Sequence, residues 1–210
     1  LNTLSDSLDR DSDGLADMGK DLQDRARAAM FSLGAAYPEL SGYYPQPKGL
    51  LFPAFLSVQN LSGIYSPFTI EANYNSAMVS YNLPFTICHE LSHLRGFMQE
   101  EEANFIGFLA CVNADDTAFN YSGYLLGWIY ATNELYEVDY DTFEEIYNRL
   151  SDNVKADLSA NSSFWKRYDS KVAEVSGQIN DHYLKANGQS DGIKSYDRMV
   201  DLMITWFRSK

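Results

Sequence analysis

Two of the chain's three histidines lie four residues apart, with a glutamate between them, in the segment His89-Glu-Leu-Ser-His93. This is an HExxH pattern. On an α-helix, residues four apart share one face, so His89 and His93 can bind one metal ion with Glu90 held beside it. Hydrolytic zinc centres need neutral nitrogen ligands and a carboxylate that takes a proton from the zinc-bound water. The pattern therefore predicts a zinc-dependent hydrolase, most simply a peptidase, with Glu90 as general base.

The alternative is a pair of buried histidines with a purely structural role. The surrounding sequence favours the motif being carried on a helix, because Pro84 suits a first helical turn and Gly96 offers an end. Leu91 and Leu94 continue an apolar stripe between them. This context lowers the chance of a random match, and the structural alternative stays open until metal content is measured.

A third ligand is expected from residues 100–111, which begin with three glutamates and then become apolar. Acidic residues in a first helical turn often only complement the helix dipole. Glu102, however, shares a helix face with apolar residues three, four and seven positions later. We predict Glu102 as the third ligand, Glu101 as the fallback, and Glu100 facing water. The longer HExxHxxGxxH pattern fails at Gln99, because glutamine is a poor zinc ligand.

The HELSH segment, the short turn after it and the segment Glu100-Glu-Glu-Ala-Asn-Phe105 resemble the gluzincin class of zinc peptidases. The Glu-Ala-Asn-Phe piece is similar to the ImmA/IrrE peptidases. A closer resemblance is to an uncharacterised bacterial family of membrane-anchored HExxH proteins, a domain of unknown function, over residues 55–73, 83–111, 183–189 and 194–198. The resemblance implies that His89, His93 and Glu102 are metal ligands and that Glu90 is the catalytic base. It supplies no substrate.

Composition narrows the class of protein. With 210 residues, 45% of them hydrophobic and 14% aromatic, the chain can bury a sizeable core as one domain. The net charge of -13 argues against a nucleic-acid partner, since phosphate binding depends on a basic surface. It argues equally against docking on anionic lipid. The expected partner is a peptide or protein substrate.

Location is predicted from two features. The longest apolar runs, around residues 103–112 and 121–131, are too short to cross a bilayer. The chain begins with Leu1 and resembles an excised fragment, and the resembling family carries membrane helices before this region. We therefore expect the native protein to be membrane-anchored, with this domain outside the cytoplasm.

The expected fold class is α+β, a helix-dominated zincin-like domain with a small β-sheet beside the HExxH helix. The single domain, residues 1–210, divides into N-terminal helices (1–36), a sheet with the zinc-binding helices (54–113) and a helical C-terminal part (114–210). Apart from the two motif helices, helices are predicted over residues 1–8, 15–33, 121–136, 140–150, 163–185 and 195–208. Strands are predicted over 55–58 and 63–73, joined by a turn at 60–63.

The acidic linker between the first two helices matches the start of a calcium loop, with Asp9, Asp11 and Asp13 in the first ligand positions. The twelfth position is Lys20, where such a loop needs a bidentate acid. An ordinary acidic turn is therefore the preferred interpretation, and a Ca²⁺ site is the alternative.

The zinc hydrolase mechanism also needs a donor for the developing oxyanion, and Tyr196 is the predicted donor, because the resemblance includes it. Tyr183 and His182 are alternatives. The carboxylate that orients the ligand imidazoles is left undecided between Asp115 and Asp116.

Residues 63–69 are the candidate edge strand that would bind a substrate backbone, with plain sheet packing as an equal alternative.

Cys88 and Cys111 lie at similar distances from the turn between the motif helices, so either a disulfide or two free buried thiols is compatible with the sequence.

Two other functions stay open: a catalytically silent metal-binding or adaptor domain at the membrane surface, and a cell-wall amidase.

Overall fold

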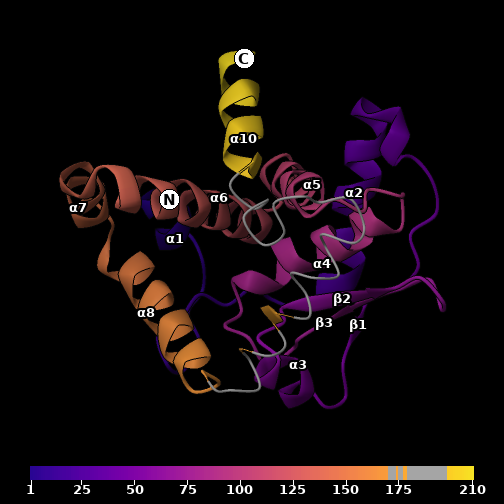
Figure 1. Cartoon of the computed structure of the whole chain (residues 1–210), viewed down its shortest axis with the longest axis horizontal. Coiled ribbons are helices and arrows are strands. Elements are labelled where there is room, and N and C mark those ends of the chain that lie inside the picture. The colour runs from indigo at the N-terminus through magenta and orange to yellow at the C-terminus, as the bar shows by residue number, and fades with distance from the viewer. Residues whose placement is uncertain (170–173, 175–176, 179–197) are drawn as a thin grey trace.

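The computed structural model describes residues 1–169, 174, 177–178 and 198–210. Within them the predicted α+β class, dominated by helices, is confirmed (Figure 1). The helical elements are α1 (Asn2–Asp6), α2 (Leu22–Ala36), η1 (Pro38–Leu40), α3 (Ala54–Val58), α4 (Asn82–His93), α5 (Glu100–Val112), α6 (Thr117–Val138), α7 (Tyr140–Asn148), α8 (Asp152–Lys166) and α10 (Arg198–Arg208).

The sheet has three short strands, β1 (Lys48–Gly49), β2 (Gly63–Ser66) and β3 (Glu71–Tyr74), in the order β1-β3-β2. β1 runs parallel to β3, and β2 runs antiparallel to it with Gly63 opposite Tyr74. β2 is therefore an edge strand of this sheet.

The structure corrects the predicted hairpin. Residues 55–58 form part of helix α3, because Pro53 already has helical dihedral angles and starts the helix. Asn60 has a left-handed φ of 59° and follows the end of that helix, so it does not connect two strands. The hairpin turn instead lies between β2 and β3, where Ile70 has a positive φ of 55°.

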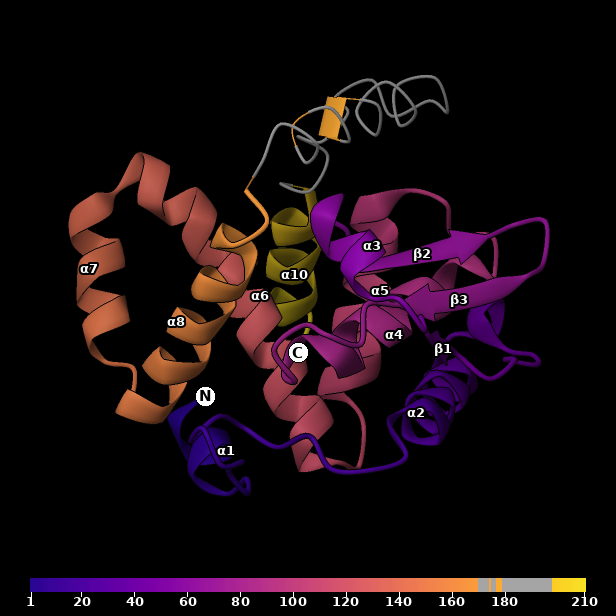
Figure 2. The same ribbon diagram turned by 90° about the horizontal axis from the view of Figure 1, so that it is seen from below.

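Helix α4 lies at the centre of the fold. Figure 1 shows α4 between the sheet and α5, and Figure 2 shows α7 and α8 on the side of the molecule opposite the sheet, with α6 between. Every residue of α4 except Leu83 is buried. A Cβ at Gly107 of α5 would meet the backbone nitrogen of His89 at 3.3 Å, so the glycine lets the two helices pack closely.

The N-terminal region differs from the prediction. α2 begins at Leu22, later than expected, and an antiparallel bridge joins Arg10 to Ala16 in the preceding loop. Asp11 accepts hydrogen bonds from the backbone amides of Asp13 and Leu15, so its carboxylate stabilises the turn itself. The carboxylates of Asp9, Asp11 and Asp13 do not form a metal-binding group among the described residues, which argues against the calcium alternative.

The C-terminal helices are described only in part. The predicted helix at 163–185 overlaps the end of α8, its residues 174 and 177–178 are helical, and the remainder lies outside the described residues. The helix predicted at 195–208 corresponds to α10 over its described part. Tyr196, Tyr183 and His182 lie outside the described residues. No helix in the described part of the chain is long and apolar enough to cross a membrane.

A buried carboxylate fixes α8 to the N-terminal loop. Asp157, fully buried, receives two 2.9 Å hydrogen bonds from the Arg10 guanidinium, one from the Ala16 amide and one from the Tyr121 hydroxyl. Removing one partner of such a group leaves an uncompensated buried charge. Segments far apart in the sequence therefore depend on this one side chain.

We predict that Asp157→Ala lowers the free energy of unfolding by about 3–5 kcal/mol, because the Arg10 charge loses its partner. Urea denaturation followed by circular dichroism measures this. Glu145→Ala, which removes the exposed pair with Arg149, is the matched control and should cost at most about 1 kcal/mol. Equal losses in the two variants would contradict the assigned role of Asp157.

Candidate metal centre

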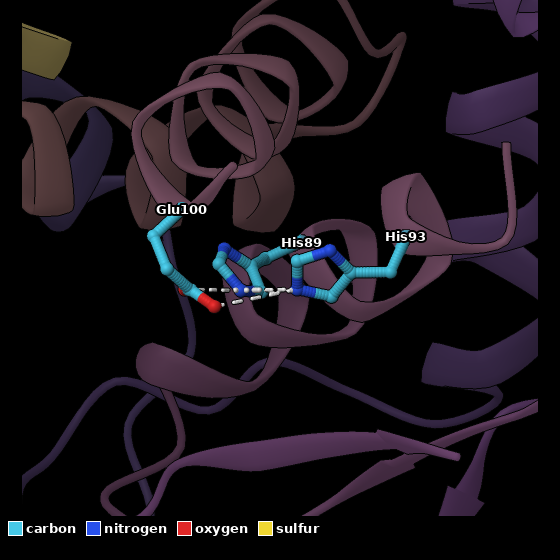
Figure 3. A group of neighbouring side chains, drawn as sticks. All are labelled: His89, His93 and Glu100. Atoms are coloured by element: carbon cyan, nitrogen blue, oxygen red, sulfur yellow. Dashed lines mark hydrogen bonds and ion pairs between the residues drawn. The ribbon is translucent and has the colours of Figure 1, made fainter. Parts of the chain in front are cut away.

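The two motif histidines face each other from successive turns of α4. Their Nε2 atoms are 3.2 Å apart, and the rings meet edge to face (Figure 3). The backbone carbonyl of Phe97 accepts a 2.7 Å hydrogen bond from Nδ1 of His93. Since a carbonyl only accepts, the proton of neutral His93 is on Nδ1, and its Nε2 lone pair faces the site.

Glu100, the first residue of α5, supplies the third group. Its carboxylate lies 3.3 Å from Nε2 of His89 and 3.8 Å from Nε2 of His93 (Figure 3). α4 ends just before Gly96, whose φ is 89°, and the chain turns back so that the start of α5 lies against the end of α4. One ligand atom from each of the three residues lies within 4.8 Å of the others.

The predicted register of α5 was therefore wrong. Glu102 is exposed, and Glu101 is buried with its carboxylate 3.4 Å from the Arg198 guanidinium of α10. Glu100, expected to face water, points at the histidines. The face that meets α4 consists of Glu100, Asn104, Gly107 and Cys111, at helical spacings of four, three and four. Because α5 is buried on most sides, its apolar neighbours did not identify that face.

Asn104 is a site residue that the sequence analysis missed. It is buried one turn after Glu100, and its side chain interacts with His89. His89 Nδ1 and the Asn104 amide nitrogen both lack another hydrogen-bond partner. An amide oxygen turned toward Nδ1 would hold the imidazole with Nε2 facing the other ligands. In the sequence, the spacing of four between Glu100 and Asn104 already indicates that the two side chains share one face of a helix.

Glu90 is buried beside the histidines, with Oε1 3.9 Å from Nε2 of His89. Its Oε2 has no hydrogen-bond partner. β2 crosses directly over it, since a Cβ at Gly63 would come within 2.8 Å of Glu90 Cγ. Burial raises the pKa of Glu90 to about 8, because the positive charge of His89 only partly offsets the loss of solvation.

The three metal-ligand candidates are also electrostatically coupled. Burial lowers the pKa of His89, but the hydrogen bond to Glu100 and the nearby carboxylates outweigh it and raise the pKa to about 9. Burial and the charge of His89 lower the pKa of His93 to about 4. Burial opposes the ionisation of Glu100, yet its contacts with both histidines lower its pKa. A cation is thus favoured between these groups, and a proton on His89 fills that role when no metal is bound.

The spacing of the three groups fits a small divalent metal ion. Ligands at about 2.0–2.2 Å with tetrahedral angles are separated by roughly 3.3–3.6 Å. The two Nε2 atoms are 3.2 Å apart, Oε2 of Glu100 lies 3.3 Å from Nε2 of His89, and Oε1 of Glu100 lies 3.8 Å from Nε2 of His93. Each oxygen of Glu100 thus faces a different histidine, at a separation close to this range. The donors are two imidazole nitrogens and one carboxylate, which leaves a fourth position for another ligand. In the described part of the chain, no other group of three such residues meets.

Other residues considered from sequence lie elsewhere. Cys88 and Cys111 are both buried and unbonded. Asp116 accepts hydrogen bonds from the first amides of α6 and pairs with Arg25, so it is a structural cap, and Asp115 is exposed. The predicted orienting role is thus filled by other groups, since the Phe97 carbonyl accepts from His93 Nδ1 and Asn104 interacts with His89. Gln99, the last position of the longer HExxHxxGxxH pattern, is exposed and is not among the three residues that meet.

A family model matches residues 1–204, nearly the whole chain. The chain belongs to the family described as "Protein of unknown function (DUF3810)". No curated protein and no solved structure matches the sequence significantly. This membership confirms the resemblance to an uncharacterised family of unknown function.

We predict that Glu100→Ala raises the dissociation constant for zinc by at least about 100-fold, because it removes one of three ligands. Glu102→Ala should change it less than about threefold, since that side chain is exposed. Titration with a competing chelator measures both constants. The opposite ranking would return the ligand role to Glu102.

The raised pKa of Glu90 predicts a pH-dependent stability in metal-free protein. The unfolded chain ionises Glu90 near pH 4.5, whereas the folded chain holds the proton to about 8, so folding stability is lost as pH rises between these values. Glu90→Gln cannot ionise, and its stability relative to wild type should rise by roughly 3 kcal/mol from about pH 5 to about pH 8.5. Urea denaturation in chelator measures it.

The matched control is Glu144→Gln on the exposed side of α7. Because this side chain is exposed, the substitution should change the free energy of unfolding by less than about 0.5 kcal/mol at either pH. A pH-independent difference for Glu90→Gln as well would show that Glu90 is not desolvated.

Proposed function

We propose that this protein is a zinc-dependent metallopeptidase with His89, His93 and Glu100 as ligands and Glu90 as general base. The observation that carries the proposal is the buried Glu90 carboxylate, whose Oε2 has no hydrogen-bond partner, placed beside a group of three residues that could hold a metal ion. Two histidines with a purely structural role would not explain why Glu90 is buried beside them, in addition to Glu100, with one oxygen that has no hydrogen-bond partner. Two neutral nitrogens and one carboxylate are the ligand set of many hydrolytic zinc sites.

Zinc, when bound, supplies a Lewis acid that activates a water molecule and polarises the scissile carbonyl. Glu90 accepts the proton of the attacking water on its carboxylate and delivers it to the departing amine. Burial raises the pKa of Glu90 in the metal-free protein, and the positive charge of a bound metal ion would lower it again, so that Glu90 is ionised when it acts as the base. Phe97 holds His93 through its Nδ1, and Asn104 is placed to hold His89.

The substrate backbone is proposed to bind along β2. This strand is at the edge of the sheet and passes over Glu90 at Gly63, while the Tyr65 ring lies 5.9 Å from that of His93. An extended peptide added to this edge would run past the metal-ligand group. The absence of a side chain at Gly63 leaves room for Glu90 beneath the strand.

The predicted oxyanion donor, Tyr196, lies outside the described residues. Within them we propose Tyr130 on α6, which lies near enough to Glu100 for burial and the charge of Glu100 to raise the pKa of its hydroxyl. A protonated phenol can donate a hydrogen bond.

We predict that Glu90→Gln retains zinc but lowers the rate of peptide hydrolysis by about 100-fold or more, since the general base is lost. Cleavage of a mixed library of quenched fluorescent peptides by the zinc-loaded protein, with zinc measured by elemental mass spectrometry, tests this. Undiminished cleavage by the variant would refute Glu90 as the base.

A variant at Gly63 and its control test whether β2 holds Glu90 in place. Gly63→Val should displace Glu90 and reduce hydrolysis while zinc stays bound. Glu102→Gln, on the exposed side of α5, should leave both properties unchanged. A zinc-loaded wild type that cleaves neither peptides nor cell-wall amides would instead favour a silent binding domain.

A further inference from the structure

One region of the surface exposes large apolar side chains to an unusual degree. They lie on the loop before α3, on α3 itself, on β2 and in the hairpin turn. Phe68 is 97% exposed, Leu51 91% and Phe52 80%. We call the following set the apolar face: Leu51, Phe52, Phe55, Ile64, Phe68 and Ile70. Isolated exposed apolar residues are common, but six from one short segment are not.

The same segment carries almost no charge. Between Glu39 and Glu90, the only acidic or basic residues apart from His89 are Lys48 and Glu71. These two form an ion pair with each other. The net charge of -13 therefore lies entirely on the rest of the chain. The apolar face is a neutral region on a strongly acidic protein.

Strand geometry places part of this set away from the metal centre. Gly63 and Tyr65 of β2 face α4, as their contacts with Glu90 and His93 show. Successive residues in a strand point to opposite faces, so Ile64 points away from α4. α3 lies on that same outer side of the sheet (Figure 1). The sheet therefore separates Ile64 and α3 from the metal-ligand group.

We propose that the apolar face docks this protein on an uncharged lipid bilayer, with the side chains of Phe68, Leu51 and Phe52 inserted into the interfacial region. Their exposures show that these side chains protrude from the surface and have few neighbours. A protein partner would need matching pockets for protruding residues, whereas a fluid bilayer needs none. Burial of apolar side chains in the interface supplies the driving force.

Charge also selects the kind of lipid. A basic surface would indicate anionic headgroups, but this face has only the Lys48–Glu71 pair, which is internally neutral. The acidic remainder of the chain repels an anionic surface. Neutral or zwitterionic lipid is thus the occupant that fits both the apolar side chains and the charge distribution. The proposal is independent of metal binding and of hydrolysis.

Flotation of the full 210-residue chain with phosphatidylcholine vesicles tests the proposal. Wild type should float with the vesicles, and adding an anionic lipid at low salt should weaken its binding. Phe52→Ser and Phe68→Ser should each lower the partition coefficient by about tenfold, because each removes one inserted ring. Val138→Ser, equally exposed at the far end of α6, is the matched control and should bind as wild type does.

Three outcomes would overturn the proposal: no flotation of wild type, flotation that both phenylalanine variants retain, or binding that requires anionic lipid. Light scattering after size exclusion provides a further check. A dimer that Phe52→Ser and Phe68→Ser convert to monomer, without vesicle binding, would show that the face joins two copies of the chain. Thermal denaturation confirms that the variants are folded, and zinc content separates this test from that of the metal centre.

Discussion

The close packing of α5 on α4 is the constraint on which the site depends. Gly107 lies against the backbone of His89, and the same face of α5 carries Glu100 and Asn104 toward the histidine side chains. A larger residue at position 107 would separate the helices, since backbone atoms on α4 cannot move aside as a flexible side chain can. The position of the carboxylate therefore follows from helix packing and is not set by a flexible loop.

This packing places several ionisable groups where water cannot solvate them. Glu90 and Glu100 are two carboxylates beside two imidazoles, and their pKa values move in opposite directions. The group with direct imidazole contacts ionises readily, whereas the one without hydrogen bonds holds its proton. A bound cation would replace the proton on His89 and complete the charge balance of the site. In the proposed mechanism, Glu100 binds the metal ion and Glu90 transfers the proton.

β2 links the site to the surface. Its inner face covers Glu90 through Gly63, and its outer face contributes Ile64 to the apolar face. Since strand side chains alternate, a short strand can serve a buried polar site on one side and an apolar surface on the other. Asp157, on the opposite side of the fold, instead fixes α8 to the N-terminal loop and has no part in the site. The proposed function and the predicted contribution to stability thus depend on different buried carboxylates.

The sequence by itself determined His89, Glu90 and His93 as a group, because a spacing of four on one helix is a local property. It also determined that a second, acidic-headed helix follows, and the α+β class. Only the tertiary structure decided that Glu100 is the residue that meets the histidines. That choice depends on how α5 rotates against α4, and a helix buried on most sides has no apolar stripe that reveals it. The tertiary structure also decided that residues 54–58 form helix α3. The helical backbone at Pro53 starts this helix, although the aromatic and branched residues that follow favour a strand.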